Sequence, residues 1–153
     1  MDFPLRDLNE TEKQVVNNAP IIVGILIGCA DGEMSQDEMD RIEEVIKTKT
    51  FSEKNDVHYL YDDIASNDLT GTIANIFDGL GNSAQDKATS AIAQLTELNS
   101  ILPKLNPTYA IQYRDSLLDL AVAVAKASGG VFGIGTISEE EKDLIDLPMI
   151  NEI

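Results

Sequence analysis

Carboxylate side chains are concentrated at one turn of this chain, and their chemistry suits metal-ion binding. Four of them fall within a single short stretch, at Asp31, Glu33, Asp37 and Glu38. Hard divalent cations such as Ca²⁺ and Mg²⁺ prefer oxygen ligands of this kind. The residues therefore predict a divalent-cation site at the turn, for calcium or magnesium ahead of zinc.

The turn matches the later half of an EF-hand calcium loop but not the earlier half. An acid precedes a glycine, an apolar residue follows two positions beyond it, and a serine and a closing Glu38 complete the pattern. Ile27 and Cys29 stand where the first acidic ligands belong, so a complete EF-hand is excluded. One short turn rarely encloses six ligands without water. We therefore expect weak binding, with a dissociation constant of about 10⁻⁴ to 10⁻³ M.

Helix capping offers a second interpretation of the same residues. Ser35 followed three positions later by Glu38 has the spacing of a capping box, in which the two side chains satisfy each other's backbone amides. Acidic residues in a first helical turn also complement the helix dipole. Capping explains Ser35 and Glu38 well and Asp31 and Glu33 less well. Both interpretations therefore stay open.

Two apolar stretches must hold this turn in place. Residues 21–30 lead directly into it, and residues 117–125 form a second stretch that is almost as apolar. A helix that is apolar all round must be wrapped by other helices. We expect the two to contact each other, with close approach permitted by a set of small residues: Gly24, Gly28, Ala121 and Ala125.

Helix start signals recur along the whole chain. They are caps or prolines at Asn9, Pro20, Ser35, Ser52, Ser83, Pro107 and Ser138, and one further helix is expected from about Leu69 to Leu80. The first helix is expected to stop near Asn18, and Gly32 is expected to end the second as a left-handed cap. Apolar and polar residues never alternate over a useful length, which argues against strands. The sequence predicts one all-α domain over residues 1–153, with about eight helices.

An internal repeat is also predicted. Residues 32–38 align with residues 135–141, and each segment joins an apolar helix to an amphipathic one. This favours two pseudo-repeated helix-turn-helix halves around the two apolar helices, with chance similarity as the alternative. The second copy, which includes Ser138 and Glu141, has no acid matching Asp31, so it gives less support for a second cation site.

The turn at residues 30–38, after an apolar helix and with a second copy near the end, resembles the tellurite-resistance TerB-like family. The resemblance implies a compact all-helical fold of two related halves. It also implies a non-enzymatic cytoplasmic role in metal or oxyanion stress, with acidic residues proposed to bind a divalent cation. By the match to the motif, Asp31 and Glu38 are the first positions to which this cation-binding role would apply. Related domains fused to DnaJ-type co-chaperones look like interaction modules.

Charge narrows the range of partners. The chain has 11 basic and 27 acidic residues, which gives a formal net charge of −16. Such a surface repels phosphate backbones, so nucleic acid is not expected as a partner. It suits a protein partner with a basic surface, or it confers only high solubility. A homodimer is also compatible with the sequence.

Neither an enzyme nor a membrane protein is expected. His58 is the only histidine, Cys29 lies within the apolar stretch, and no nucleophile or phosphate-loop motif is recognisable. The apolar stretches are shorter than the roughly 20 residues that span a bilayer. The N-terminus does not resemble a signal peptide, and a lone buried thiol suits a reducing compartment, so a cytoplasmic location is expected.

Two classes of function follow from these observations. One is a cation-binding stress protein of the TerB-like kind. The other is a helical interaction module whose acidic residues confer only solubility.

Overall fold

The structure is a computed structural model that describes residues 3–30, 32–53, 55–128 and 142–153. It is 75% helix without a strand in those residues, which confirms the all-α class. The α-helices are α1 (Glu10–Gly28), α2 (Gln36–Ser52), α3 (His58–Ser66), α4 (Leu69–Gly79), α5 (Ala84–Thr96), the single-turn α6 (Leu98–Ile101) and α7 (Pro107–Ser128). Two 3₁₀ turns, η1 (Phe3–Leu5) and η2 (Leu102–Lys104), complete the list.

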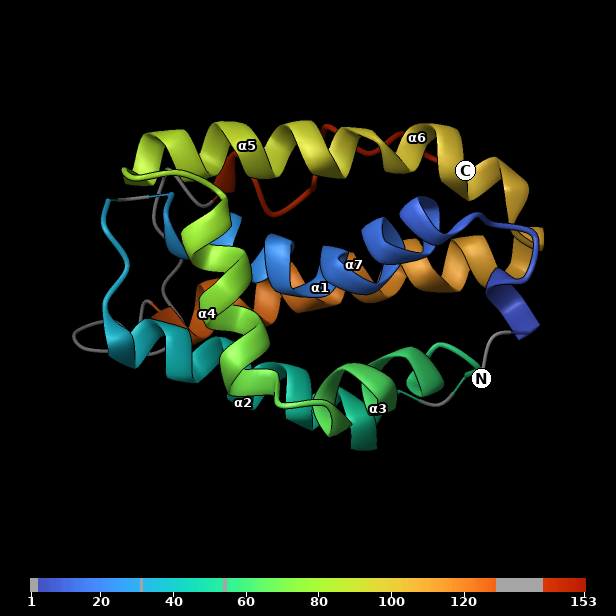
Figure 1. Ribbon diagram of the computed structural model, residues 1–153, viewed down its shortest axis with the longest axis horizontal. Coiled ribbons are helices and arrows are strands. Elements are labelled where there is room, and N and C mark those ends of the chain that lie inside the picture. The colour runs from blue at the N-terminus through green and yellow to red at the C-terminus, as the bar shows by residue number, and fades with distance from the viewer. Residues whose placement is uncertain (1–2, 31, 54, 129–141) are drawn as a thin grey trace.

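Helix α1 lies at the centre of the molecule (Figure 1). It packs against α7, α5, α2 and α4, and α2 also packs against α3 and α7. Figure 1 shows α5 and α6 along one side, α2 and α3 along the opposite side, and α4 running across between them. The expected contact between the two apolar helices is therefore confirmed, and Leu117, Leu120 and Ala121 of α7 are fully buried.

The expected break at Pro20 does not occur. Asn9 caps α1 through a capping box with Glu12, as the sequence indicates, but the helix then continues through Pro20 to Gly28. It also ends before Gly32, with Cys29 as its C-cap. This merging of two expected helices into one is one reason why the described residues hold fewer helices than the eight expected.

A tyrosine on α7 compensates for the missing amide of Pro20. Proline has no N–H, so in a continuous helix it leaves the carbonyl four residues earlier, that of Val16, without its usual donor. Val16 is fully buried, and an unsatisfied carbonyl there would be costly. The hydroxyl of Tyr113 donates to this carbonyl oxygen at 2.8 Å. The hydrogen bond therefore satisfies α1 at Pro20 and ties it to α7.

The two glycines of α1 accommodate α2 and the turn before it rather than α7. A Cβ atom added to Gly24 would lie 2.9 Å from Cγ2 of Ile42, and one added to Gly28 would lie 2.5 Å from Sδ of Met34. The expectation that these glycines bring α1 close to α7 is therefore wrong. They instead allow Ile42 and Met34 to approach the backbone of α1.

Most of the remaining helix starts agree with the sequence. Ser35, Ser83 and Pro107 begin α2, α5 and α7, and α4 begins at Leu69. Ser52 does not begin a helix, because it is the last residue of α2. Helix α3 starts only at His58, after a turn in which the side chain of Asn55 accepts from the amide of Val57.

The final segment of the chain contacts α6 and α7, and its described residues do not form the expected last amphipathic helix. The start at Ser138 and the repeated turn lie outside the described residues, and residues 143–146 form a turn. Leu147 and Ile150 are buried. The side-chain amide of Asn99 donates to the carbonyl of Met149 at 2.9 Å and accepts from the amide of Asn151 at 2.8 Å.

The Tyr113 hydrogen bond can be tested with a double-mutant cycle. Tyr113→Phe should lower the free energy of unfolding by about 1–3 kcal/mol, because it leaves the buried Val16 carbonyl without a donor. Adding Pro20→Ala should recover most of that loss by restoring the helical N–H. Tyr109→Phe, at another buried tyrosine of α7, is the matched control. Urea denaturation measures the four proteins of the cycle and the control, and strictly additive effects of Tyr113→Phe and Pro20→Ala would contradict the assignment.

Buried tyrosines should also make the fold sensitive to alkali. Burial raises the pKa of Tyr109 to about 12, and it also raises the pKa of Tyr61 and Tyr113 above the usual value. Because the unfolded state ionises near pH 10, it gains stability relative to the folded state as the pH rises above that value. Stability should therefore be intact below about pH 10 and fall above it.

Tyrosinate absorbance and circular dichroism, followed together, test this expectation. Tyr59→Phe protein should be used, because Tyr59 is 42% exposed and its signal would overlap with those of the buried tyrosines. Ionisation of the buried tyrosines should coincide with loss of helix. Ionisation while the helical signal stays intact would show that these hydroxyls are accessible in the folded state.

Candidate functional site

The acidic turn supplies a cap for a distant helix. Oε1 of Glu33 accepts a hydrogen bond from the backbone amide of Ala84, the first residue of α5, at 3.1 Å. This amide belongs to a helix N-terminus, where backbone N–H groups lack partners within their own helix. Sequence reasoning treated Glu33 only as a candidate ligand. No local signal reveals the contact, because the two residues are 51 positions apart.

Ser35 and Glu38 form the expected capping box at the start of α2. Oγ of Ser35 accepts from the amide of Glu38, and Oε1 of Glu38 accepts from the amide of Ser35, both at 3.2 Å. Asp37 lies on the first turn of α2 and is exposed to solvent. The capping interpretation is thus confirmed for Ser35 and Glu38.

The four candidate ligands are not seen as one cluster. Asp31 lies outside the described residues, and among those that are described there is no group of three or more His, Cys, Asp or Glu side chains that could hold a metal ion. Glu33 and Glu38 also both accept from backbone amides. A cation at this turn would share or displace those contacts, and the site stays a prediction.

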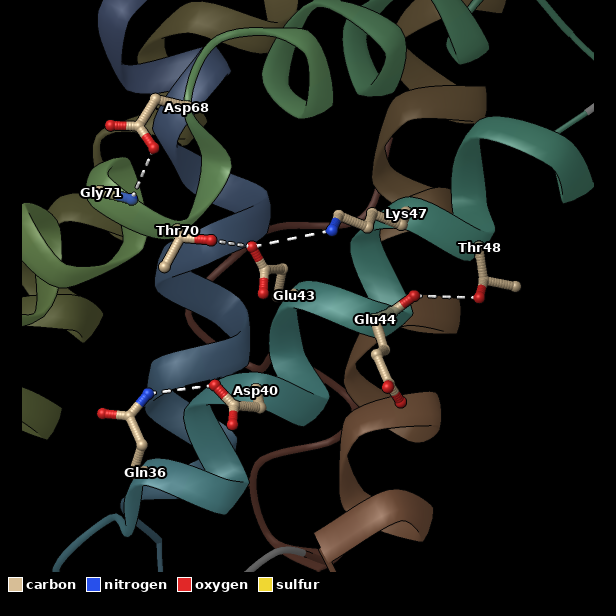
Figure 2. A network of polar contacts seen from close by, with 9 residues as sticks. All are labelled: Gln36, Asp40, Glu43, Glu44, Lys47, Thr48, Asp68, Thr70 and Gly71. Atoms are coloured by element: carbon tan, nitrogen blue, oxygen red, sulfur yellow. Dashed lines mark hydrogen bonds and ion pairs between the residues drawn. The ribbon is translucent and has the colours of Figure 1, made fainter.

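Helix α2 presents three different flanks beyond the turn. On the flank toward α4, the carboxylate of Glu43 accepts from the hydroxyl of Thr70 and lies 3.8 Å from Nζ of Lys47 (Figure 2). Thr70 follows the N-cap of α4, Asp68, whose side chain accepts from the amide of Gly71 at 3.3 Å. This flank is therefore occupied by contacts within the fold.

Three carboxylates and an aromatic ring lie along the solvent-facing flank of α2. They are exposed and recur at helical spacing, and we call the set the acidic ridge: Asp37, Asp40, Glu44 and Phe51. Lys47 and Thr48 are also exposed on α2, and Lys47 is paired with Glu43. Asp40 accepts from the side-chain amide of Gln36 at 3.0 Å. Figure 2 shows the carboxylate of Glu44 directed away from Lys47. Phe51 is 89% exposed, the highest value among the large hydrophobic residues described as exposed.

The third flank faces α7 across a hollow of about 510 Å³, which we call the α2–α7 groove. Val45 and Ala123 give it apolar walls, and three carboxylates line it, those of Glu44, Glu53 and Asp119. The two cationic residues in the lining are Arg41 and Lys49.

Lys49 is already neutralised where it lines the groove. Its Nζ lies 2.8 Å from Oε2 of Glu53, and the two side chains are only 10% and 12% exposed. The same ammonium lies 5.6 Å from the centre of the Tyr61 ring, a cation–π distance. The hydroxyl of Tyr61 in turn lies 3.1 Å from Oγ of Ser116 on α7. These contacts hold Lys49 against the core. The other charged residues of the lining are Arg41, Glu44 and Asp119.

Residues with catalytic potential are held elsewhere. Nδ1 of His58 lies 3.2 Å from Oδ2 of Asp62, one helical turn along α3. Cys29 is buried at the end of α1, as its place in the apolar stretch indicates. Neither residue lines the α2–α7 groove.

These features define a helical bundle with an acidic surface. Comparison with models of protein families, with curated proteins and with solved structures finds no match. The resemblance to the TerB-like family therefore rests on the turn motif and the helical layout alone. Among the residues that the structure describes, no helix is long and apolar enough to cross a membrane.

Two substitutions separate a cap from a cation site at the turn. Ser35→Ala should lower the free energy of unfolding by about 1 kcal/mol with or without a divalent cation, because it removes the acceptor for the Glu38 amide. Asp31→Asn should leave that cap in place. A cation site would instead make Asp31→Asn lose the stabilisation by Ca²⁺ or Mg²⁺, about 2.7 kcal/mol at a hundredfold excess over the dissociation constant.

Thermal melts with and without each cation measure both effects. Equal cation-induced shifts in the wild type and in Asp31→Asn would contradict the cation site. Screening of the −16 net charge acts on both proteins alike and would account for such a result.

Proposed function

We propose that this chain is a non-enzymatic helical module that binds a protein partner with a basic surface through the acidic ridge of α2. The observation that carries the proposal is Phe51, which is 89% exposed at the end of a line of carboxylates. Phe51 is an exposed aromatic anchor, and Asp37, Asp40 and Glu44 would set the charge of the partner that lies along the helix.

Aromatic residues are characteristic of interface centres. Phenylalanine, tyrosine and tryptophan are enriched in protein interfaces relative to the rest of the surface, and a few such anchors carry most of the binding energy. A phenylalanine ring on a free surface gains nothing from burial, but it would gain about 25 cal/mol for each Å² covered by a partner. Phe51 is therefore the residue of α2 with most to gain from docking.

Charge favours a basic partner over a second copy at this ridge. The chain carries −16 overall, and the exposed carboxylates of the ridge add to that field locally. Two such ridges facing each other would place like charges together, which is unfavourable. A basic partner would be attracted over a distance of about a Debye length, and its association would weaken with salt.

The cation-binding role in tellurite or metal stress is a separate hypothesis that rests on the TerB-like resemblance. Glu33 and Glu38 already accept from backbone amides, so capping accounts for both without a metal.

A cytoplasmic location is part of our proposal, because the single cysteine of the chain is buried and suits a reducing compartment.

The proposal can be tested with a labelled amphipathic helical peptide of lysine and leucine, whose binding is followed by fluorescence anisotropy. Phe51→Ser should weaken binding by about 2 kcal/mol, roughly thirtyfold, because it removes the aromatic anchor. Asp40→Lys should also weaken binding, and it should reduce the dependence on salt. Glu97→Lys is the matched control, since Glu97 is an exposed acid at the C-cap of α5. Helices α5 and α2 lie on opposite sides of the molecule (Figure 1).

Equal losses for Asp40→Lys and Glu97→Lys, with none for Phe51→Ser, would show that the peptide responds only to net charge. That result would overturn the ridge as a docking surface. Circular dichroism of each variant confirms that the fold is retained, since all three positions are exposed.

A further inference from the structure

We infer that the α2–α7 groove receives a lysine or arginine side chain of the basic partner. This inference rests on the proposed function and adds the kind of residue that the partner must present. It is carried by the combination of a hollow of about 510 Å³, apolar walls and carboxylates at the same place, beside the exposed ridge.

The walls of the groove suit a long aliphatic stem. Val45 on α2 and Ala123 and Ala127 on α7 are half-buried and line the hollow. Because alanine side chains are short, α7 leaves space there that a larger residue would fill. Lysine and arginine bury their methylene stems along apolar surface while the charged head stays with polar groups. The hollow and its lining match that division.

The charged groups of the lining favour a cationic head. Glu44 from α2 and Asp119 from α7 contribute carboxylates, and both residues are exposed. Lys49 is neutralised by Glu53 at 2.8 Å, so the other charged residues of the lining are Arg41 and the two carboxylates. The balance of these three groups is −1, within a chain of net charge −16. An incoming cation would bring this part of the lining to neutrality.

Other occupants fit less well. An anionic group would meet Glu44 and Asp119, and the ammonium of Lys49 is already held by Glu53 and the Tyr61 ring. A purely aliphatic side chain would cover the apolar walls and lower the solvation of the carboxylates without pairing them. A basic side chain satisfies both parts of the lining.

The groove and the acidic ridge are continuous. Glu44 belongs to both, and Thr48 and Ser52, on the next turns of α2, line the groove beside the ridge residue Phe51. A partner lying along α2 could therefore contact the aromatic ring and place one side chain in the groove. The partner is then expected to carry an apolar patch next to at least one lysine or arginine.

The test uses the full chain and a fluorescently labelled octalysine peptide, whose only side chain is the one proposed to enter. Ala123→Leu fills the groove without changing the net charge, and it should weaken octalysine binding about tenfold. The control is Ala93→Leu, which adds the same apolar volume at an exposed site on α5 and should leave the affinity unchanged.

A second pair of variants tests the carboxylates of the groove lining, with substitutions that remove a charge and keep the size of the side chain. Asp119→Asn should weaken octalysine binding several-fold more than Glu97→Gln, which removes the same charge from a remote exposed site. Octaornithine has the same charge and a stem one methylene shorter than octalysine. It should therefore bind the wild type about fourfold more weakly than octalysine does. Ala123→Leu should bind the two peptides equally. Thermal melts of each variant confirm folding.

The outcomes separate this inference from the proposed function. If Ala123→Leu binds octalysine like the wild type and Asp119→Asn behaves like Glu97→Gln, the groove does not take the side chain and this inference is overturned. The docking of the lysine–leucine peptide on Phe51 and Asp40 would still stand. If Ala123→Leu no longer distinguishes octalysine from octaornithine while Ala93→Leu still does, the result supports entry of the side chain into the groove.

Discussion

One hydrogen bond allows α1 to pass through the middle of the fold as a single helix. Pro20 removes the donor that the carbonyl of Val16 would normally receive, and the hydroxyl of Tyr113 replaces it at 2.8 Å. The pairing has a geometric consequence as well as an energetic one. Because the bond joins a fixed point on each helix, it links α1 to α7 at one defined position of their interface.

The arrangement of α2 follows from the same central helix. Gly24 and Gly28 leave room on α1 for Ile42 and Met34, so α2 and the turn before it can approach closely. With Ile42 and Ile46 fully buried against the core, helical geometry directs Asp40, Glu44 and Phe51 outward. Packing on the buried face therefore determines which residues form the ridge. The residues that a partner could contact on the ridge therefore depend on how α2 packs on α1.

Features that depend on neighbouring residues were predictable from the sequence, whereas features that join distant residues were not. The capping boxes at Asn9 and Ser35 were recognisable because both partners lie within four positions of each other. The continuity of α1 was missed because its explanation, Tyr113, lies 97 positions from Val16. The local pattern was also enough for the all-α class, since the spacing of apolar residues along the chain is helical.

The candidate site shows the same limit. Sequence reasoning grouped Glu33 with Asp37 and Glu38 because they are close along the chain, yet Glu33 serves α5 and Glu38 serves α2. The exposure of Phe51, in contrast, was within reach of the sequence. Phe51 lies seven residues after Glu44, two turns along the same helix, so helical spacing alone places it on the acidic face.

The acidic residues of this chain thus fall into two groups, those that make contacts within the fold and those that lie at the surface. Glu33, Glu38, Glu43 and Glu53 hold a backbone amide, a hydroxyl or an ammonium, and each links parts of the fold. Removing one of these would first affect stability. Asp37, Glu44 and Asp119 lie at the surface along α2 and the facing edge of α7, where a charge contributes little to folding. Carboxylates that a fold does not use for its own contacts remain able to act on something outside it. In this chain they lie beside the most exposed aromatic ring described and the α2–α7 groove, so charge, apolar surface and space coincide on one side of α2.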